Sequence, residues 1–261
     1  MFNNRLSKIC TEKNNRLCLG LDLDNRKLQV NTLSYFEGFV KDIIDTTIDL
    51  CPIYKINFAF YERLGKNGYH ILSEITNHID GRAITIADAK RGDIGNSSKY
   101  YAEAIFDTLN YDSITVSPYM GEDSIKPFCK YNDRGVFILC LTSNIGSENF
   151  QNKNINGDKL YLHVAKLALN MNKNNNIGLV VGATKNKQME SIREYSKGLP
   201  WLIPGVGFQG GSLEDSINIG SKYDSLPIIN VSRGIIYAGN GSLDDIRLAT
   251  EEYTEKIRNI L

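Results

Sequence analysis

The sequence predicts an α/β fold, a single closed (β/α)8 (TIM) barrel in which eight parallel strands are each followed by a helix. Short apolar runs rich in β-branched residues recur along the 261 residues, and almost every one is followed by a segment with helical periodicity. The runs are continuously apolar, which is typical of parallel strands covered on their outer face. Eight such units in about 250 residues favour a closed barrel, and a doubly wound open sheet is the alternative.

The eight strand candidates share this apolar, β-branched character. In chain order they are Arg16–Leu23, Ile53–Phe58, Ala83–Ala87, Ser113–Val116, Gly135–Leu141, Ile177–Val181, Leu202–Val206 and Ile228–Val231. The helical patterns follow them at residues 33–50, 62–79, 97–109, 123–131, 158–171, 186–197, 212–221 and 242–260. Each unit therefore supplies one strand and one covering helix.

The domain organisation is expected to be simple. No linker rich in Pro, Gly or Ser and no shift in composition divides the chain, so we expect residues 1–261 to form one domain. The Asn-rich pieces Gln151–Asn156 and Asn172–Asn176 are interpreted as surface loops. The first follows the fifth strand, on the barrel face where active-site loops lie.

Composition and charge exclude several classes of protein. Acidic and basic residues balance at 30 each, which argues against a nucleic-acid footprint or a polybasic membrane patch. No apolar run approaches the length of a membrane span, and residues 1–5 lack the apolar stretch of a signal peptide. The five widely spaced cysteines are typical of reduced core residues. We expect a soluble, cytoplasmic protein.

The charged string DAKRGD at Asp88–Asp93 lies directly after the apolar run 83–87. Side chains alternate across a strand, so Asp88 and Lys90 can share one face, and Gly92 lets the chain turn before Asp93. Desolvating these charges at the mouth of an apolar core is costly, so stability alone does not explain them. We interpret Asp88, Lys90 and Asp93 as candidate catalytic residues.

Polar residues follow other strand candidates too, as expected for chemistry at the strand ends of a barrel. Asp22 lies at the end of the first, the second carries Lys55 and Asn57, and Thr142-Ser143 follow the fifth. A lone lysine there would more often be exposed or part of a structural ion pair. Two lysines at the ends of adjacent strands, interleaved with aspartates, instead indicate a site of alternating charge.

The ends of the seventh and eighth strands predict a phosphate site. Residues 204–211 contain four glycines, and such a turn presents backbone N–H groups close to a ligand. Glycine-rich turns alone are weak signals, since many turns need glycine for steric reasons. Arg233 follows the next strand and can hold phosphate oxygens in a bidentate fork. Loops seven and eight are also where phosphate sites recur in this fold, so the pair favours phosphate binding.

Metal ligation has little support in the sequence. His70, His78 and His163 fall on helical patterns away from the strand ends, and His and Cys lack the spacing of a zinc site. By residue type, a magnesium site built from Asp22, Asp88 and Asp93 remains an alternative.

Together these residues resemble the orotidine 5′-phosphate decarboxylase family, and the resemblance spans nearly the whole chain. It is carried by Leu21-Asp22, Tyr54–Phe60, Asp88–Gly95, Val181–Thr184, Pro204–Gly207, Gln209–Gly211 and Ser232-Arg233. The spacing D-x-K-x-x-D is highly specific when the other motifs follow in this order. The stretches Asp88–Gly95 and Pro118–Gly121 resemble the bacterial subgroup. The family implies a phosphate-binding homodimer that makes UMP in pyrimidine synthesis without metal or organic cofactor.

The resemblance also implies roles for the charged residues at the strand ends. Asp22 and Lys55 would contact the ribose hydroxyls, and Asp88 would lie beside the substrate carboxylate. Lys90 would protonate C6 after carbon dioxide leaves. Asp93 would reach into the site of the partner subunit.

Further residues are implied to surround the substrate. Ile94 would accompany Asp93 into the partner's site, and Ser97 is a candidate to join them. Thr142 or Ser143 would bond the pyrimidine edge, and both stay candidates. Gln209 would bridge phosphate and base, and Arg233 and the backbone amides of the seventh loop would hold the phosphate. Pro204 and Gly210 in that loop, and Ser232 beside Arg233, are further substrate-binding candidates.

The sequence departs from the motifs of the family at two places, and two other functions are considered beside the one the resemblance implies. Lys185-Asn186-Lys187 follows the Val181–Thr184 motif, and Phe208 stands where a smaller residue is common. One alternative is a magnesium-dependent sugar-phosphate decarboxylase or aldolase that uses the same string around an enediolate. The other is a catalytically silent phosphate-binding barrel that acts as a sensor or scaffold.

Overall fold

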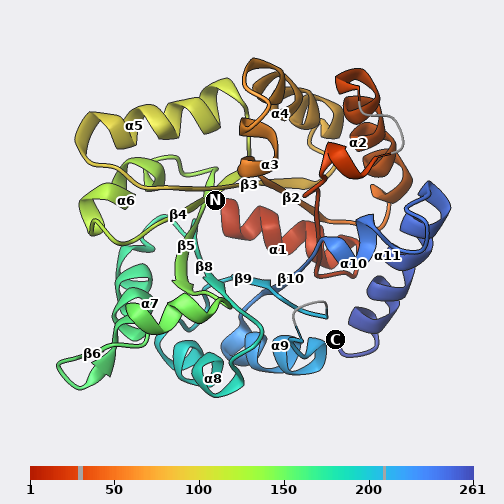
Figure 1. Cartoon of the computed structure of the whole chain (residues 1–261). Coiled ribbons are helices and arrows are strands. Elements are labelled where there is room, and N and C mark those ends of the chain that lie inside the picture. Colours follow the sequence, from red (N-terminus) through yellow and green to blue (C-terminus); the bar gives the residue numbers. More distant parts are fainter. Residues whose placement is uncertain (29–31, 208–209) are drawn as a thin grey trace.

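The computed structural model describes residues 1–28, 32–207 and 210–261, and its centre is a closed ring of parallel strands (Figure 1). Around the ring the strands pair in the order β1-β10-β9-β8-β5-β4-β3-β2. Because β1 pairs with both β2 and β10, the sheet has no free edge and the open-sheet alternative is wrong. The strands are β1 (Leu17–Gly20), β2 (Ile53–Asn57), β3 (Ile84–Arg91), β4 (Ser113–Val116), β5 (Gly135–Leu141), β8 (Ile177–Val181), β9 (Trp201–Pro204) and β10 (Pro227–Val231).

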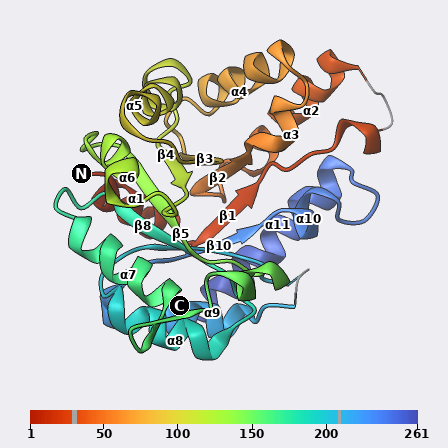
Figure 2. The ribbon, with the colours of Figure 1, turned by 60° about the vertical axis from the view of Figure 1, so that its left-hand side comes forward.

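Helices cover the outside of the ring, as Figures 1 and 2 show from two directions. They are α2 (Leu33–Thr47), α3 (Phe58–Glu62), α4 (Lys66–Ile79), α5 (Gly95–Glu103), α6 (Glu122–Cys129), α7 (Leu160–Met171), α8 (Asn186–Tyr195), α9 (Leu213–Gly220), α10 (Arg233–Ile236) and α11 (Leu243–Arg258). The pattern at 62–79 is divided between α3 and α4, because Gly65 takes a left-handed φ of 59°. The pattern at 97–109 divides into α5 and a π-helical turn, η2 (Ala104–Thr108).

The N-terminal helix α1 (Phe2–Glu12), which the sequence pattern did not predict, lies across one end of the ring (Figure 1). Its buried residues Phe2, Leu6 and Cys10 are four apart and therefore share one face. They pack against inward-facing strand residues, namely Cys18, Ile53, Ile84, Ile86, Phe137, Val180, Leu202 and Ile228. This helix closes the N-terminal end of the barrel.

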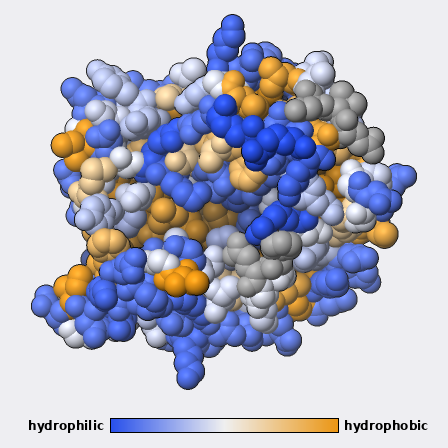
Figure 3. All heavy atoms as spheres, in the orientation of Figure 1, coloured by the Kyte–Doolittle hydropathy of each residue, from blue (hydrophilic) through white to orange (hydrophobic). Residues whose placement is uncertain are grey.

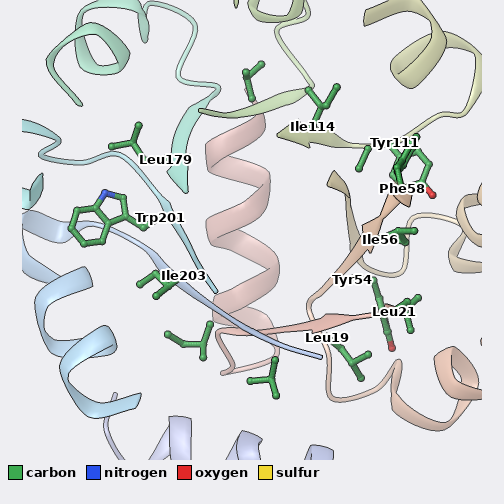
Figure 4. Close-up of a cluster of buried hydrophobic side chains, with 14 of the residues drawn as sticks. Leu19, Leu21, Tyr54, Ile56, Phe58, Tyr111, Ile114, Leu179, Trp201 and Ile203 are labelled. Carbon is green, nitrogen blue, oxygen red and sulfur yellow. The ribbon is translucent and has the colours of Figure 1, made fainter. Parts of the chain in front are cut away.

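The larger core lies between the strands and the outer helices. Figure 4 shows strand residues of this core, among them Leu19, Ile56, Trp201 and Ile203, pointing away from the ring and from α1 at its centre. Because side chains alternate along a strand, the outward set builds this core and the inward set is left for the barrel interior.

Both Asn-rich pieces were predicted to be surface loops, and the second, Asn172–Asn176, differs from that prediction at Asn176. Residues 151–156 do lie at the surface, where β6 (Asn154–Ile155) pairs with β7 (Asp158–Lys159) in a short hairpin. Asn176, however, is buried, and its amide donates to the carbonyl oxygens of Cys129, Tyr131 and Arg134 (3.2, 2.9 and 3.2 Å). It closes a turn that would otherwise bury unpaired carbonyl groups.

Within the described ranges, none of the helices is long and apolar enough to cross a bilayer.

Candidate active site

The inward face of each strand changes character from one end of the barrel to the other. On β3, Ile84 and Ile86 join the apolar interior, and Asp88 follows two residues later. On β2, Ile53 is followed in the same way by Lys55. Every second residue of a strand faces the interior, so on these two strands the inward positions at the C-terminal end of the ring hold polar side chains.

A cavity of about 260 Å³ opens at this end. Figure 3, in the orientation of Figure 1, shows the face hollowed near its centre, with apolar residues inside a mainly hydrophilic rim. Leu139, Val180 and Leu202 line the apolar part. The predicted site residues that line the cavity are Asp22, Lys55, Asp88, Lys90, Thr142, Ser143, Pro204, Ser232 and Arg233. Residues from opposite sides of the barrel are thereby brought together.

Four side chains form a row of alternating charge, which we call the charge array: Asp22, Lys55, Asp88 and Lys90. Lys55 Nζ lies 3.2 Å from Asp22 Oδ1 and 3.2 Å from Asp88 Oδ2. Lys90 Nζ lies 2.7 Å from Asp88 Oδ1. Lys55 and Asp88 are buried, whereas the side chain of Lys90 is 47% exposed. The array therefore ends in an ammonium group that faces the cavity.

The electrostatics of the array keep its buried members ionised. Burial alone would raise the pKa of Asp88, but the ammonium groups of Lys55 and Lys90 outweigh burial and lower the pKa to about 2. Burial alone would lower the pKa of Lys55, but the carboxylates of Asp22 and Asp88 outweigh it and raise the pKa. Alternating charges thus persist in a largely desolvated setting at neutral pH.

Strand β3 is longer than predicted and runs through the charged string to Arg91. Its pairing with β4 shifts register between Ala87 and Arg91, which indicates a bulge. Lys90 sits in this bulge with a left-handed φ of 49°, whereas Gly92 is not among the positive-φ glycines. The left-handed residue before Asp93 is therefore the lysine itself. A non-glycine residue in this conformation costs about 1–3 kcal/mol, which the surrounding contacts must offset.

The site contains two further polar residues, Thr115 and Asn230, that were not predicted from the sequence. Thr115 on β4 donates to Asp88 Oδ1 (3.0 Å) and accepts from the Lys90 amide (3.0 Å). Asn230 on β10 lines the cavity and is mostly buried. Both are polar residues inside strand candidates. Such a polar residue at a buried strand position is the signal that could have found them.

The seventh and eighth loops form another part of the cavity wall. Arg233, Ser232 and Gly205 line it there. Gly205 takes a left-handed φ of 95°, which lets the loop backbone reach the cavity. Gly210 does not line the cavity, and its amide donates to the carbonyl oxygen of Gly207 (2.8 Å). Gln209 and Phe208 lie outside the described residues.

The fifth loop brings both of its candidates to the cavity. Thr142 Oγ1 donates to Asn144 Oδ1 (2.6 Å), and the Thr142 amide donates to Gln151 Oε1 (2.8 Å). Ser143 lines the cavity beside it, so the choice between the two stays open. Lys185, one of the departures from the family wording, holds this loop through Ser147 Oγ (3.0 Å).

Asp93, Ile94 and Ser97 do not line the cavity of this single chain. Asp93 Oδ1 accepts from the Ile94 amide (2.8 Å), and Ile94 is 59% exposed. The described ranges contain no group of three His, Cys, Asp or Glu side chains arranged to hold a metal ion. Asp22 and Asp88 instead bind the ammonium group of Lys55, apart from Asp93.

Comparisons with known proteins agree with this geometry. A family model described as "Orotidine 5'-phosphate decarboxylase / HUMPS family" matches residues 15–243. A protein named orotidine 5′-phosphate decarboxylase from Dehalococcoides mccartyi is 46% identical over 265 residues, covering 100% of this chain and 97% of that protein. One of the same name from Herpetosiphon aurantiacus is 42% identical, covering 93% and 91%.

Solved structures give the same result. The Leishmania donovani OMP decarboxylase superposes with a TM-score of 0.87 at 37% identity, covering 98% of both chains. The Plasmodium berghei orotidine 5′-monophosphate decarboxylase superposes with a TM-score of 0.85 at 26% identity, covering 100% of this chain and 98% of that one. Family model, full-length identity and barrel geometry agree, and the chain belongs to the orotidine 5′-phosphate decarboxylase family.

Proposed function

We propose that Lys90 is the acid in the decarboxylation of orotidine 5′-phosphate to UMP, the carboxy-lyase reaction of the family to which the chain belongs. The observation that carries this proposal is that the charge array and Arg233 line the same cavity. The pyrimidine would lie at the array and the phosphate at Arg233. The reacting group and the binding group of the substrate would thus be held at separate places.

The array suits the chemistry of this reaction. The bond between C6 and the carboxylate breaks, its electron pair stays on C6, and carbon dioxide leaves. The ammonium group of Lys90, held 2.7 Å from Asp88, would stabilise the negative charge that develops at C6 and then transfer its proton there. Asp88 would repel the substrate carboxylate, and this repulsion ends when the carboxylate leaves.

The other cavity residues would orient the substrate. Asp22 and Lys55 would contact the ribose hydroxyls, and Thr142 or Ser143 the pyrimidine edge. Binding of the remote phosphate would supply energy for orienting the reacting base. The groups proposed to surround the phosphate are Pro204, Gln209, Gly210, Ser232 and Arg233.

We further propose that the active form is a homodimer in which Asp93, Ile94 and Ser97 serve the partner's site. Asp93 follows the β3 bulge and does not line the cavity of its own chain, which supports this assignment. Mixing Asp93→Ala with Lys90→Ala subunits tests it. Activity should reappear in the mixture, because a heterodimer then contains one intact site. If none reappears, the shared site is ruled out.

The same proposal includes a single domain, a reaction without metal or cofactor, and a place in the cytoplasm. The free thiols of all five cysteines support a reducing compartment.

One assay tests the function. Purified protein with orotidine 5′-phosphate and EDTA should show the ultraviolet absorbance change of UMP formation. Lys90→Ala should lower kcat about 10⁴-fold, the upper range for loss of a general acid, and retain binding of a UMP analogue. Activity abolished by EDTA would favour the magnesium-dependent alternative. The absence of turnover in the wild-type protein would favour the silent barrel.

A further inference from the structure

Thr115 contacts two residues of the charge array, Asp88 and Lys90. It lies on β4, is fully buried, and its Oγ1 is 3.0 Å from Asp88 Oδ1 and 3.0 Å from the Lys90 amide nitrogen. The Asp88 carboxylate, ionised at neutral pH, can only accept a hydrogen bond, so the threonine hydroxyl donates to Asp88 and accepts from Lys90. One hydroxyl therefore joins the carboxylate of one residue to the backbone of the other.

The backbone at Lys90 needs such a contact. The pairing of β3 with β4 resumes at Arg91 after the last regular pair at Ala87, so Lys90 lies in the bulge between them. Lys90 also has a left-handed φ of 49°. A hydrogen bond from a buried side chain can hold a backbone conformation that the sheet pairing does not impose. The long side chain of Lys90 begins at this point, so the position of its Cα limits where the ammonium group can lie.

We propose that Thr115 is a positioning residue for decarboxylation, which fixes the Asp88 carboxylate and the Lys90 backbone relative to each other. This inference rests on the proposed role of Lys90. Thr115 does not itself line the cavity. Its loss should therefore affect the chemical step and leave substrate binding, which depends on the remote phosphate group, nearly unchanged.

Thr115→Val is the main test, because valine has the shape of threonine and suits a strand but lacks the hydroxyl. A misplacement of about 1 Å can lower a rate about 100-fold, so we expect kcat to fall roughly 10- to 100-fold with KM changed less than about threefold. Thr115→Ser keeps the hydroxyl and should retain kcat within about threefold. Should the valine variant not fold, Thr115→Ala takes its place.

Ser113→Ala is the matched control. Ser113 lies two residues earlier on the same strand, is equally buried, and its hydroxyl donates to the carbonyl oxygen of Thr85 (3.1 Å) rather than to the array. This variant should lose stability in urea but keep its kcat. Equal kcat losses in Ser113→Ala and Thr115→Val, or failure of Thr115→Ser to restore kcat, would overturn the role of Thr115.

The same measurements separate this inference from the proposed function. If Lys90→Ala abolishes turnover but folded Thr115→Val keeps the wild-type kcat, Thr115 has no positioning role and Lys90 keeps its own. If the wild-type protein does not convert orotidine 5′-phosphate, or if Lys90→Ala is fully active, the proposed function is wrong. The positioning role of Thr115, which rests on it, is then wrong as well.

Discussion

The two ends of the barrel are built from the same strands but are filled in opposite ways. At the N-terminal end, Phe2 and Leu6 of α1 pack among apolar inward-facing side chains and close the ring. At the C-terminal end, Lys55 and Asp88 face inward and a cavity opens beside them. Strand β3 contains the whole change, from Ile86 to Asp88, within two inward positions.

This difference shows how the fold separates stability from chemistry. The sealed end can be apolar because no ligand must enter it, and dense packing there stabilises the ring. The open end holds desolvated charges, which are costly unless each has a partner. Changes at the sealed end should therefore affect stability alone, and changes at the open end should affect both stability and activity.

Among the substitutions considered, Lys55→Met should cause the largest loss of stability and activity. The substitution leaves the carboxylates of Asp22 and Asp88 without the cation they share. Removing one partner of a buried ion pair costs about 3–5 kcal/mol, so urea unfolding should show a loss of that size, together with loss of decarboxylation. Lys41→Met is the control, because Lys41 bridges Glu37 and Glu74 on the outer helices and its loss should cost about 1 kcal/mol or less. Equal losses in the two variants would contradict a special role for the array.

Phe2→Ala tests the sealed end. The Phe2 ring meets the Phe137 ring edge-on with centroids 6.2 Å apart, and the side chain is 1% exposed. We expect a loss of about 3 kcal/mol in urea unfolding with an unchanged kcat in the folded protein. Lys8→Ala, on the exposed face of the same helix, should change neither quantity measurably. A fall in kcat for folded Phe2→Ala would mean that the two ends are not independent.

The pH dependence of stability sharpens the comparison further. The pKa of Asp88 is lowered in the folded state from 3.8 to about 2, so its contribution is complete above about pH 4 and is lost as pH falls toward 2. A shift of this size corresponds to about 2 kcal/mol. The difference in unfolding free energy between wild type and Asp88→Asn should be smaller at pH 3 than at pH 5.5. The same difference at both pH values would argue against an ionised, paired Asp88.

The strands were predicted most accurately where short apolar runs end at turn residues. Ser113–Val116, Gly135–Leu141 and Ile177–Val181 match β4, β5 and β8 at both ends. The prediction failed for β3, because pairing with its neighbours extends the strand through charged residues that a hydrophobic pattern excludes. Helix α1 was missed because its apolar residues form a short pattern. Their packing partner, the barrel interior, exists only after the ring has closed.

The linear order of residues was enough to establish eight βα units, the family motif and the charged residues at the strand ends. Hydrophobic runs and residue chemistry are local properties that survive without a fold. The folded chain was needed to show that Thr115 lies between Asp88 and Lys90 and that Asp93 lies apart from them. Strand register and backbone handedness decide which way these side chains point, because a shift of one residue in the pairing turns every side chain of a strand to the opposite face.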